Sequence, residues 1–194
     1  MKIYTPTDEL PRLAESSTPE QWSTAGRMLF ERKLYSAARN CFHRASLPRE
    51  EAIANAYELR DEAERAPFGQ SGTVAEVRRR DAFIRAAKAF LLCAEEYNKP
   101  VYFCRAAECF EETKEDIIAA ETYYRGGDFT KTILVYCRLR MYDEATVILQ
   151  DKRECVRQDM GGSLVEGARL HYLKRIAKDS EFVVSLSKLT NNVF

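Results

Sequence analysis

The chain has 194 residues, of which 45% are apolar, and its 30 basic and 30 acidic side chains give a formal net charge of zero. This length suits one domain or one continuous array of repeats. Zero net charge argues against a general polyanion-binding protein, although it is compatible with a local basic face. Eight glycines and six prolines occur, too few for a turn-rich β-sandwich or barrel. The composition therefore predicts an all-α fold.

No apolar run approaches the roughly 20 residues of a membrane span, and residues 1–11 lack the apolar core of a secretory signal. The six cysteines form no Cys-x-x-Cys pair and lie mostly among alanines and aromatic residues, where a thiol acts as a small apolar side chain. His43 and His171 are too few and too scattered to complete a metal site. We expect an intracellular protein, cytoplasmic or nuclear, with no membrane span and no metal.

Helix signals begin after an extended segment, residues 1–17. Thr18 can cap a helix, Pro19 suits its first position, and Gln21 completes a capping box. Two short helices then form a hairpin, and the third helix ends at a loop, residues 66–72, which contains glycines, a proline and a serine. About ten helices are expected: two before residue 48, then 49–65, a long one from residue 73, 100–112, 115–125, 128–139, 142–152, 163–176 and 179–189.

The long helix has two different halves. A second capping box, Thr73 with Glu76, marks its start, and about 22 residues would extend about 33 Å at 1.5 Å per residue. Its first half carries the triplet Arg78–Arg80, whereas residues 83–94 are apolar on nearly all sides. We expect neighbouring helices to enclose the second half and the first half to project.

One pattern recurs along the chain, an alanine followed four residues later by an aromatic residue. On a helix the two lie on one face, where the small residue lets a neighbouring helix approach and the ring fills the adjacent space. A two-helix unit cannot bury its apolar face alone, so stacked units of this kind predict an α-solenoid. The pairs are Ala38 with Phe42, Ala86 with Phe90, Ala106 with Phe110, and Ala120 with Tyr124.

Residues 19–52 resemble a tetratricopeptide repeat (TPR), a motif of two helices and 34 residues. Leu29 stands where the motif usually has tyrosine, Pro48 comes two residues early, and later segments match less closely. The resemblance implies that residues 18–194 form one domain of TPR-like hairpins. The consensus positions are occupied by Trp22, Gly26, Ala38, Phe42 and Ala45.

A partner-binding groove is also implied by this resemblance. In TPR arrays the first helix of each hairpin faces a concave groove that holds partner segments. Carried over by position, this places Arg27, Phe30 and Glu31 in the groove of the first repeat. The alternative for Phe30 is a place in the core.

A longer pattern consists of the runs Ser17–Trp22 and Gly26–Lys33 and the segments Ala38–Ala45 and Ala54–Arg60. This stretch, strongest before residue 112, is similar to the helical region of very large eukaryotic proteins. Those proteins carry a UvrD-like superfamily 1 helicase module with TPR-like repeats, and some also carry ankyrin repeats. The similarity implies that this chain is a scaffold segment that binds a protein or peptide partner, with any motor elsewhere in a larger protein. The alternative is an accessory nucleic-acid-binding module serving a linked helicase.

Five basic residues of the long helix are the candidates for contact with phosphates or with an acidic partner. A solvated face, balanced by Glu50, Glu51, Asp61 and Glu64, is the alternative. Consecutive residues diverge by about 100° around a helix, so the arginine triplet cannot form one stripe. The candidates are Arg78, Arg79, Arg80, Arg85 and Lys88.

The sequence has no Gly-x-x-x-x-Gly-Lys-[Ser/Thr] loop, so we do not expect this chain to hydrolyse ATP by itself. The run Gly126-Gly127-Asp128 is interpreted as a helix end followed by the next helix cap. Neither histidine belongs to a nucleophile motif. The chain is therefore expected not to be an enzyme and to need no cofactor.

Overall fold

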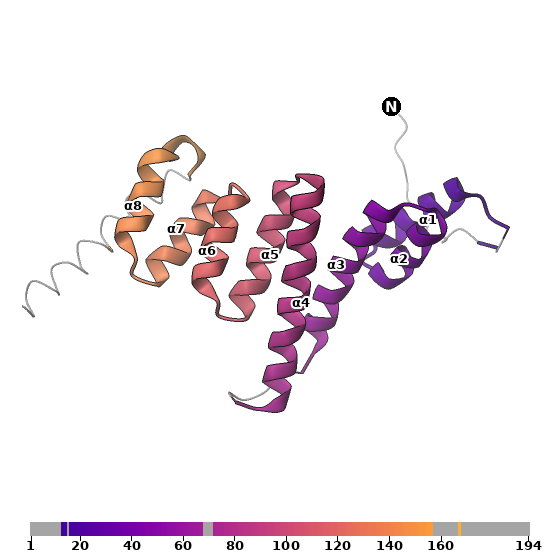
Figure 1. Cartoon of the computed structure of the whole chain (residues 1–194), viewed down its shortest axis with the longest axis horizontal. Helices are drawn as coiled ribbons and strands as arrows, with labels where there is room; N and C mark the ends of the chain where they lie inside the picture. Colours follow the sequence, from indigo (N-terminus) through magenta and orange to yellow (C-terminus); the bar gives the residue numbers. More distant parts are fainter. Residues whose placement is uncertain (1–12, 15, 68–71, 157–166, 168–194) are drawn as a thin grey trace, which may run out of the picture. The chain divides into compact units, whose positions relative to one another are not determined.

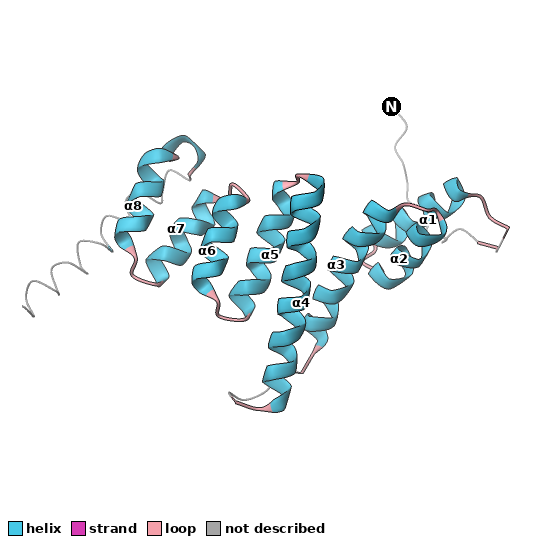
Figure 2. Cartoon of the chain, in the orientation of Figure 1, coloured by secondary structure: helices cyan, strands magenta, loops and turns pink. Residues whose placement is uncertain are grey.

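The computed structural model describes residues 13–14, 16–67, 72–156 and 167. Within these ranges the regular structure is helical and contains no strand, which confirms the all-α fold (Figure 2). Two predicted helices, 163–176 and 179–189, lie outside the described residues apart from position 167, as do most of segment 1–17 and the middle of loop 66–72. The helices are α1 (Pro19–Glu31), α2 (Tyr35–Arg44), α3 (Pro48–Arg65), α4 (Val74–Tyr97), α5 (Pro100–Glu112), α6 (Asp116–Arg125), α7 (Phe129–Arg138), α8 (Tyr142–Asp151) and the 3-10 helix η1 (Arg153–Cys155).

Side-chain caps begin three of these helices where the sequence predicts them. At α1, the Gln21 amide donates to Thr18 Oγ1 and the Thr18 amide donates to Gln21 Oε1, so both halves of the capping box form. Thr73 caps α4 in the same position, and Asp128 Oδ1 accepts the backbone amide of Lys131 at 3.0 Å. These bonds satisfy amides that have no partner inside the helix.

Left-handed residues end most of the helices. The residue after the C-cap takes a positive φ in α1, α2, α5 and α7, whereas in α4 the C-cap Asn98 does so itself. The next amide then returns to a carbonyl five residues earlier, as in the bond from Leu34 N to Leu29 O at 2.9 Å. The tight turn reverses the chain within a few residues, so consecutive helices pack side by side. The non-glycine residues with positive φ are Lys33, Ser46, Asn98, Lys114 and Arg140.

The chain forms two compact units, called here unit 1 (residues 1–115) and unit 2 (residues 116–194). In unit 1 each helix from α2 to α5 packs against the one before it, and in unit 2 α7 packs against α6 and α8 against α7 (Figure 1). The single domain predicted over residues 18–194 had no boundary at residue 115. Glu115 and Asp116, on either side of it, are held by their own units, through Arg80 at 2.9 Å and Arg138 at 2.6 Å.

The alanine-to-aromatic pattern holds for three of its four pairs. Both members are buried at Ala38 with Phe42, at Ala86 with Phe90, and at Ala106 with Phe110. In α6 the prediction is wrong by one residue. Tyr123 is fully buried and Tyr124 is 43% exposed, so the buried pair is Ala119 with Tyr123.

Gly26 marks the closest approach between α1 and α2. A Cβ atom at this position would lie 2.7 Å from Phe42 Cε1 and 3.2 Å from Cys41 Cβ. No real Cβ fits there without a shift of the Phe42 ring, which is itself buried in the core. The glycine therefore allows the two helices to pack directly.

Gly26→Ala is expected to lower the free energy of unfolding of unit 1. Alanine gains up to about 1 kcal/mol in helix propensity, but overpacking a filled core costs about 1–3 kcal/mol, so a net loss of roughly 1–2 kcal/mol results. Trp22 is the single tryptophan and packs against this core, so its fluorescence during urea unfolding measures the change. A more stable variant would show that the Phe42 ring moves without cost.

No helix in the described ranges is both long enough and apolar enough to cross a membrane.

Candidate functional site

A ladder of five aromatic rings connects all five helices of unit 1. It runs from Phe30 in α1 through Tyr35 in α2, Tyr57 in α3 and Phe90 in α4 to Tyr102 in α5, with centroid separations of 5.0 to 6.5 Å. Tyr35 and Tyr57 stack nearly parallel, at 27°, and both remain partly exposed. These two rings form an aromatic wall at the surface.

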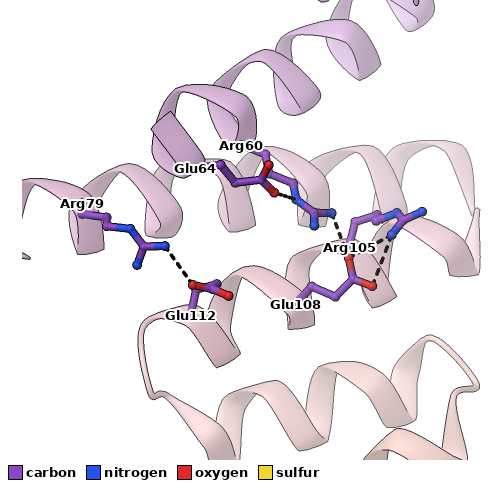
Figure 3. A network of polar contacts seen from close by, with 6 residues as sticks. All are labelled: Arg60, Glu64, Arg79, Arg105, Glu108 and Glu112. Carbon is purple, nitrogen blue, oxygen red and sulfur yellow. Dashed lines mark hydrogen bonds and ion pairs between the residues drawn. The ribbon is translucent and has the colours of Figure 1, made fainter. Parts of the chain in front are cut away.

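Beside this wall lies an ion-pair network that joins α3 to α5. Glu108 Oε2 in α5 accepts from Arg60 Nη1 in α3 at 2.8 Å and from Arg105 Nη1 at 2.9 Å (Figure 3). Arg60 Nε also donates to Glu64 Oε1 at 2.8 Å. One carboxylate thus fixes two guanidinium groups that come from different helices, with side chains about a quarter to a third exposed.

The pKa values follow from this arrangement. Burial lowers the pKa of Arg60, but the hydrogen bond that Arg60 donates to Glu64 and the charge of Glu108 outweigh it, so the net change is upward. The hydrogen bond to Glu108 raises the pKa of Arg105. Burial raises the pKa of Tyr35, with a smaller contribution from Tyr57. Both arginines remain charged and Tyr35 remains neutral through the physiological range.

The aromatic wall and the network line one side of an open groove of about 300 Å³ in unit 1, called here the α3 groove. It continues along α3 into a second hollow that shares Lys33, Tyr35 and Asp61. It carries charges of both signs, of which Arg60, Asp61, Glu64 and Arg105 are held in ion pairs. The residues that line the α3 groove are Lys33, Tyr35, Tyr57, Arg60, Asp61, Glu64 and Arg105.

None of the three residues projected from the TPR resemblance lines this groove. Arg27 and Glu31 are exposed on α1. Phe30 is partly buried, packs against the core of unit 1, and meets Tyr35 and Tyr57 edge-on at 5.2 Å. Phe30 therefore supports the aromatic wall from behind.

Two arginines of the triplet form ion pairs within unit 1, whereas the third faces solvent. Arg79 is only 14% exposed, lies 4.7 Å above the Phe83 ring, and pairs with Glu112 of α5 at 3.0 Å (Figure 3). Arg80 pairs with Glu115 at 2.9 Å. The balancing carboxylates thus come from α5 and the turn after it, rather than from residues 49–65 as the sequence analysis had considered.

The other three basic candidates face solvent on α4. Arg78, Arg85 and Lys88 are exposed, and no ion pair within the described ranges includes them. The C-terminal half of α4 is buried along one side, at Phe83, Phe90 and the alanines between them. The expectation that this half is enclosed therefore applies to one side of it.

The cysteines follow the burial pattern of small apolar residues. Cys41, Cys93 and Cys109 are buried, Cys104 and Cys137 are partly buried, and Cys155 is exposed. Among the residues that the structure describes, no three His, Cys, Asp or Glu side chains converge as metal ligands do.

Cys109 is expected to make the stability of unit 1 depend on pH in alkaline solution. Burial raises the pKa of its thiol from the usual 9.0 to about 12, so the unfolded chain loses this proton first. The stabilisation is present below pH 9.0 and is lost as the pH rises toward 12, by about 1.4 kcal/mol per pH unit.

This effect is measured as the difference in unfolding free energy between the wild type and Cys109→Ala. The difference isolates Cys109 because tyrosines that titrate in the same range are common to both proteins. It should shrink steadily above pH 9.0. A difference that stays constant with pH would show that the folded protein accommodates the thiolate.

The α3 groove was missed from sequence because its residues come from four segments that share no motif. The spacing of Arg60 with Glu64, and of Arg105 with Glu108, fits pairs on one helix. Nothing in the sequence shows that these two pairs meet through Glu108. Comparisons of the chain with protein-family models, with curated proteins and with solved structures found no match.

Proposed function

We propose that this chain is a non-catalytic helical-repeat scaffold that binds protein segments, and that the α3 groove is one of its binding surfaces. In this proposal the hairpins form an α-solenoid of TPR-like units. The observation that carries it is the groove itself, where an aromatic wall and charges of both signs are assembled from the α1–α2 turn, α2, α3 and α5. The link to a larger helicase-like protein depends on the sequence resemblance alone.

The chemistry of the groove suits a polypeptide. Tyr35 and Tyr57 offer flat apolar area at low cost in side-chain entropy. Arg60 and Arg105 are already immobilised by Glu108, so a ligand need not order them. The groove charges of both signs complement a segment that also carries both signs. The carboxylates of Asp61 and Glu64 would instead repel a nucleic-acid backbone.

A displayed library of random peptides, selected on the full chain, tests this proposal. Selected peptides should lose affinity about fivefold or more when Lys33→Glu reverses a groove charge. Lys114→Glu is the matched control, because both lysines are exposed and take nearly the same left-handed conformation, with φ of 62° and 60°. Equal sensitivity of the two variants would contradict a role for the groove.

The alternative, an accessory nucleic-acid-binding module, depends on the basic residues of α4. Two of the five candidates, Arg79 and Arg80, are neutralised by carboxylates of the same unit. Their ion pairs would have to open before they could contact phosphates. The remaining three lie on the exposed side of α4.

A further inference from the structure

The exposed side of α4 carries a row of three cations. At 3.6 residues per turn, Arg78 and Arg85 are separated by nearly two full turns, and Lys88 follows after most of another. All three are exposed and extend over about 15 Å at 1.5 Å per residue. The buried residues of α4 lie on the opposite side, from Ala82 to Ala94.

The same geometry explains why the adjacent arginines behave differently. Arg79 and Arg80 are displaced from Arg78 by about 100° and 200° around the helix. They therefore point toward α5 and the turn after it, where they form ion pairs with Glu112 and Glu115. The structure therefore separates two cations that tie α4 to α5 from three that face outward.

Apolar side chains flank the row at both ends. Val74 and Leu92 are each 66% exposed and lie in line with Arg78 and Arg85 at successive steps of three and four residues. Asp81 is exposed within the same row. The outer face of α4 is defined here as Val74, Arg78, Asp81, Arg85, Lys88 and Leu92.

We propose that the outer face of α4 docks an acidic amphipathic helix of a partner protein. The three cations call for carboxylates at the same spacing of seven and three residues, a pattern that one face of a helix presents. Val74 and Leu92 provide apolar contacts at the two ends. The surface shares no residue with the α3 groove, so the proposal stands independently of it.

A protein helix fits this face better than a nucleic acid does. Asp81 lies between Arg78 and Arg85 and would repel a phosphate backbone, whereas a helix can place a lysine or arginine opposite it. Leu92 and Val74 lack any polar group for a phosphate, and a helix would cover both. Three cations with no supporting net charge also give weak steering of a polyanion.

The test uses a designed probe helix of about six turns and the full chain. Its glutamates match the positions of Arg78, Arg85 and Lys88, its leucines match Val74 and Leu92, and one lysine faces Asp81. A second peptide of the same composition places the glutamates on the opposite side. Fluorescence anisotropy should show tighter binding of the first peptide.

The double variant Arg85→Glu/Lys88→Glu should weaken the probe about tenfold or more, since two attractive pairs become repulsive. Arg27→Glu/Lys114→Glu makes the same change in net charge at exposed positions on other elements and should leave the affinity unchanged. A probe with lysines in place of glutamates should bind the Arg85→Glu/Lys88→Glu variant more tightly than the wild type. Far-UV circular dichroism confirms that the variants remain folded.

Leu92→Ser separates a protein partner from a nucleic acid. It should weaken the probe helix while leaving the binding of a single-stranded oligonucleotide as it is in the wild type. An oligonucleotide that binds more tightly than the probe, with a steep dependence on salt and the same loss in Arg85→Glu/Lys88→Glu, would overturn the proposal in favour of a nucleic-acid surface. Equal binding of the two peptides would overturn it as well.

Discussion

Phe90→Ala is expected to lower the free energy of unfolding of unit 1 by about 3–5 kcal/mol. Phe90 is fully buried and is the fourth ring of the aromatic ladder, 5.0 Å from Tyr57 and 6.5 Å from Tyr102. Truncation removes its buried area, leaves a cavity, and breaks two ring contacts that join α4 to α3 and α5. Urea unfolding followed by Trp22 fluorescence measures the loss.

Leu92→Ala is the matched control for this variant. Leu92 lies two residues further along α4 but is 66% exposed, so its truncation should change stability by less than about 0.5 kcal/mol. Similar effects of the two substitutions would contradict the orientation of α4. A small effect of Phe90→Ala alone would mean that the neighbouring rings close the cavity.

Glu108→Gln is expected to lower the stability of unit 1 by roughly 1–3 kcal/mol, between the values for exposed and buried ion pairs. The substitution keeps the shape of the side chain but removes the charge that holds Arg60 and Arg105. Two partly buried guanidinium groups then repel each other across α3 and α5. The α3 groove should also lose affinity for selected peptides because its cations are no longer fixed.

Glu64→Gln provides the comparison, since in the described part of the chain Glu64 forms an ion pair with Arg60 only, and its side chain is 50% exposed. A change below about 1 kcal/mol is expected for it. High salt should reduce the effect of Glu64→Gln more than that of Glu108→Gln, because exposed pairs are screened more strongly. If both variants behave alike, Glu108 does not act as the shared acceptor.

The eight described α-helices could be predicted closely because their starts carry local signals. The capping box at Thr18, the side-chain cap at Thr73, the prolines at α1, α3 and α5, and Asp128 are all local signals at the helix starts. Helix ends were harder to assign from sequence. They use left-handed turns at lysine, serine and arginine, where sequence rules look for glycine.

The misplaced pair in α6 shows the limit of a spacing argument. Ala119, Ala120, Tyr123 and Tyr124 form two overlapping alanine-to-tyrosine pairs, and the sequence alone does not decide which pair faces the core. Packing places the Tyr123 ring in the core, and the Lys131 ammonium lies 4.9 Å from its centroid. Tyr124 meets Phe129 instead.

The candidate site was partly predictable for the same reason. The basic character of α4 is visible in the sequence, but its division into tied and outward-facing cations depends on Glu112 and Glu115, more than 30 residues away. The α3 groove depends entirely on such long-range contacts. Local patterns therefore located the charged helix and could not locate the groove.

The left-handed turns have a consequence for engineering this protein. Glycine at such a position relieves backbone strain of about 1 kcal/mol, so Ser46, Asn98 and Arg140 are places where a single change should make the fold more robust. Lys33 is different, because glycine there would also take a cation out of the α3 groove. A substitution of Lys33 that makes the fold more robust would therefore weaken the binding of ligands in the groove.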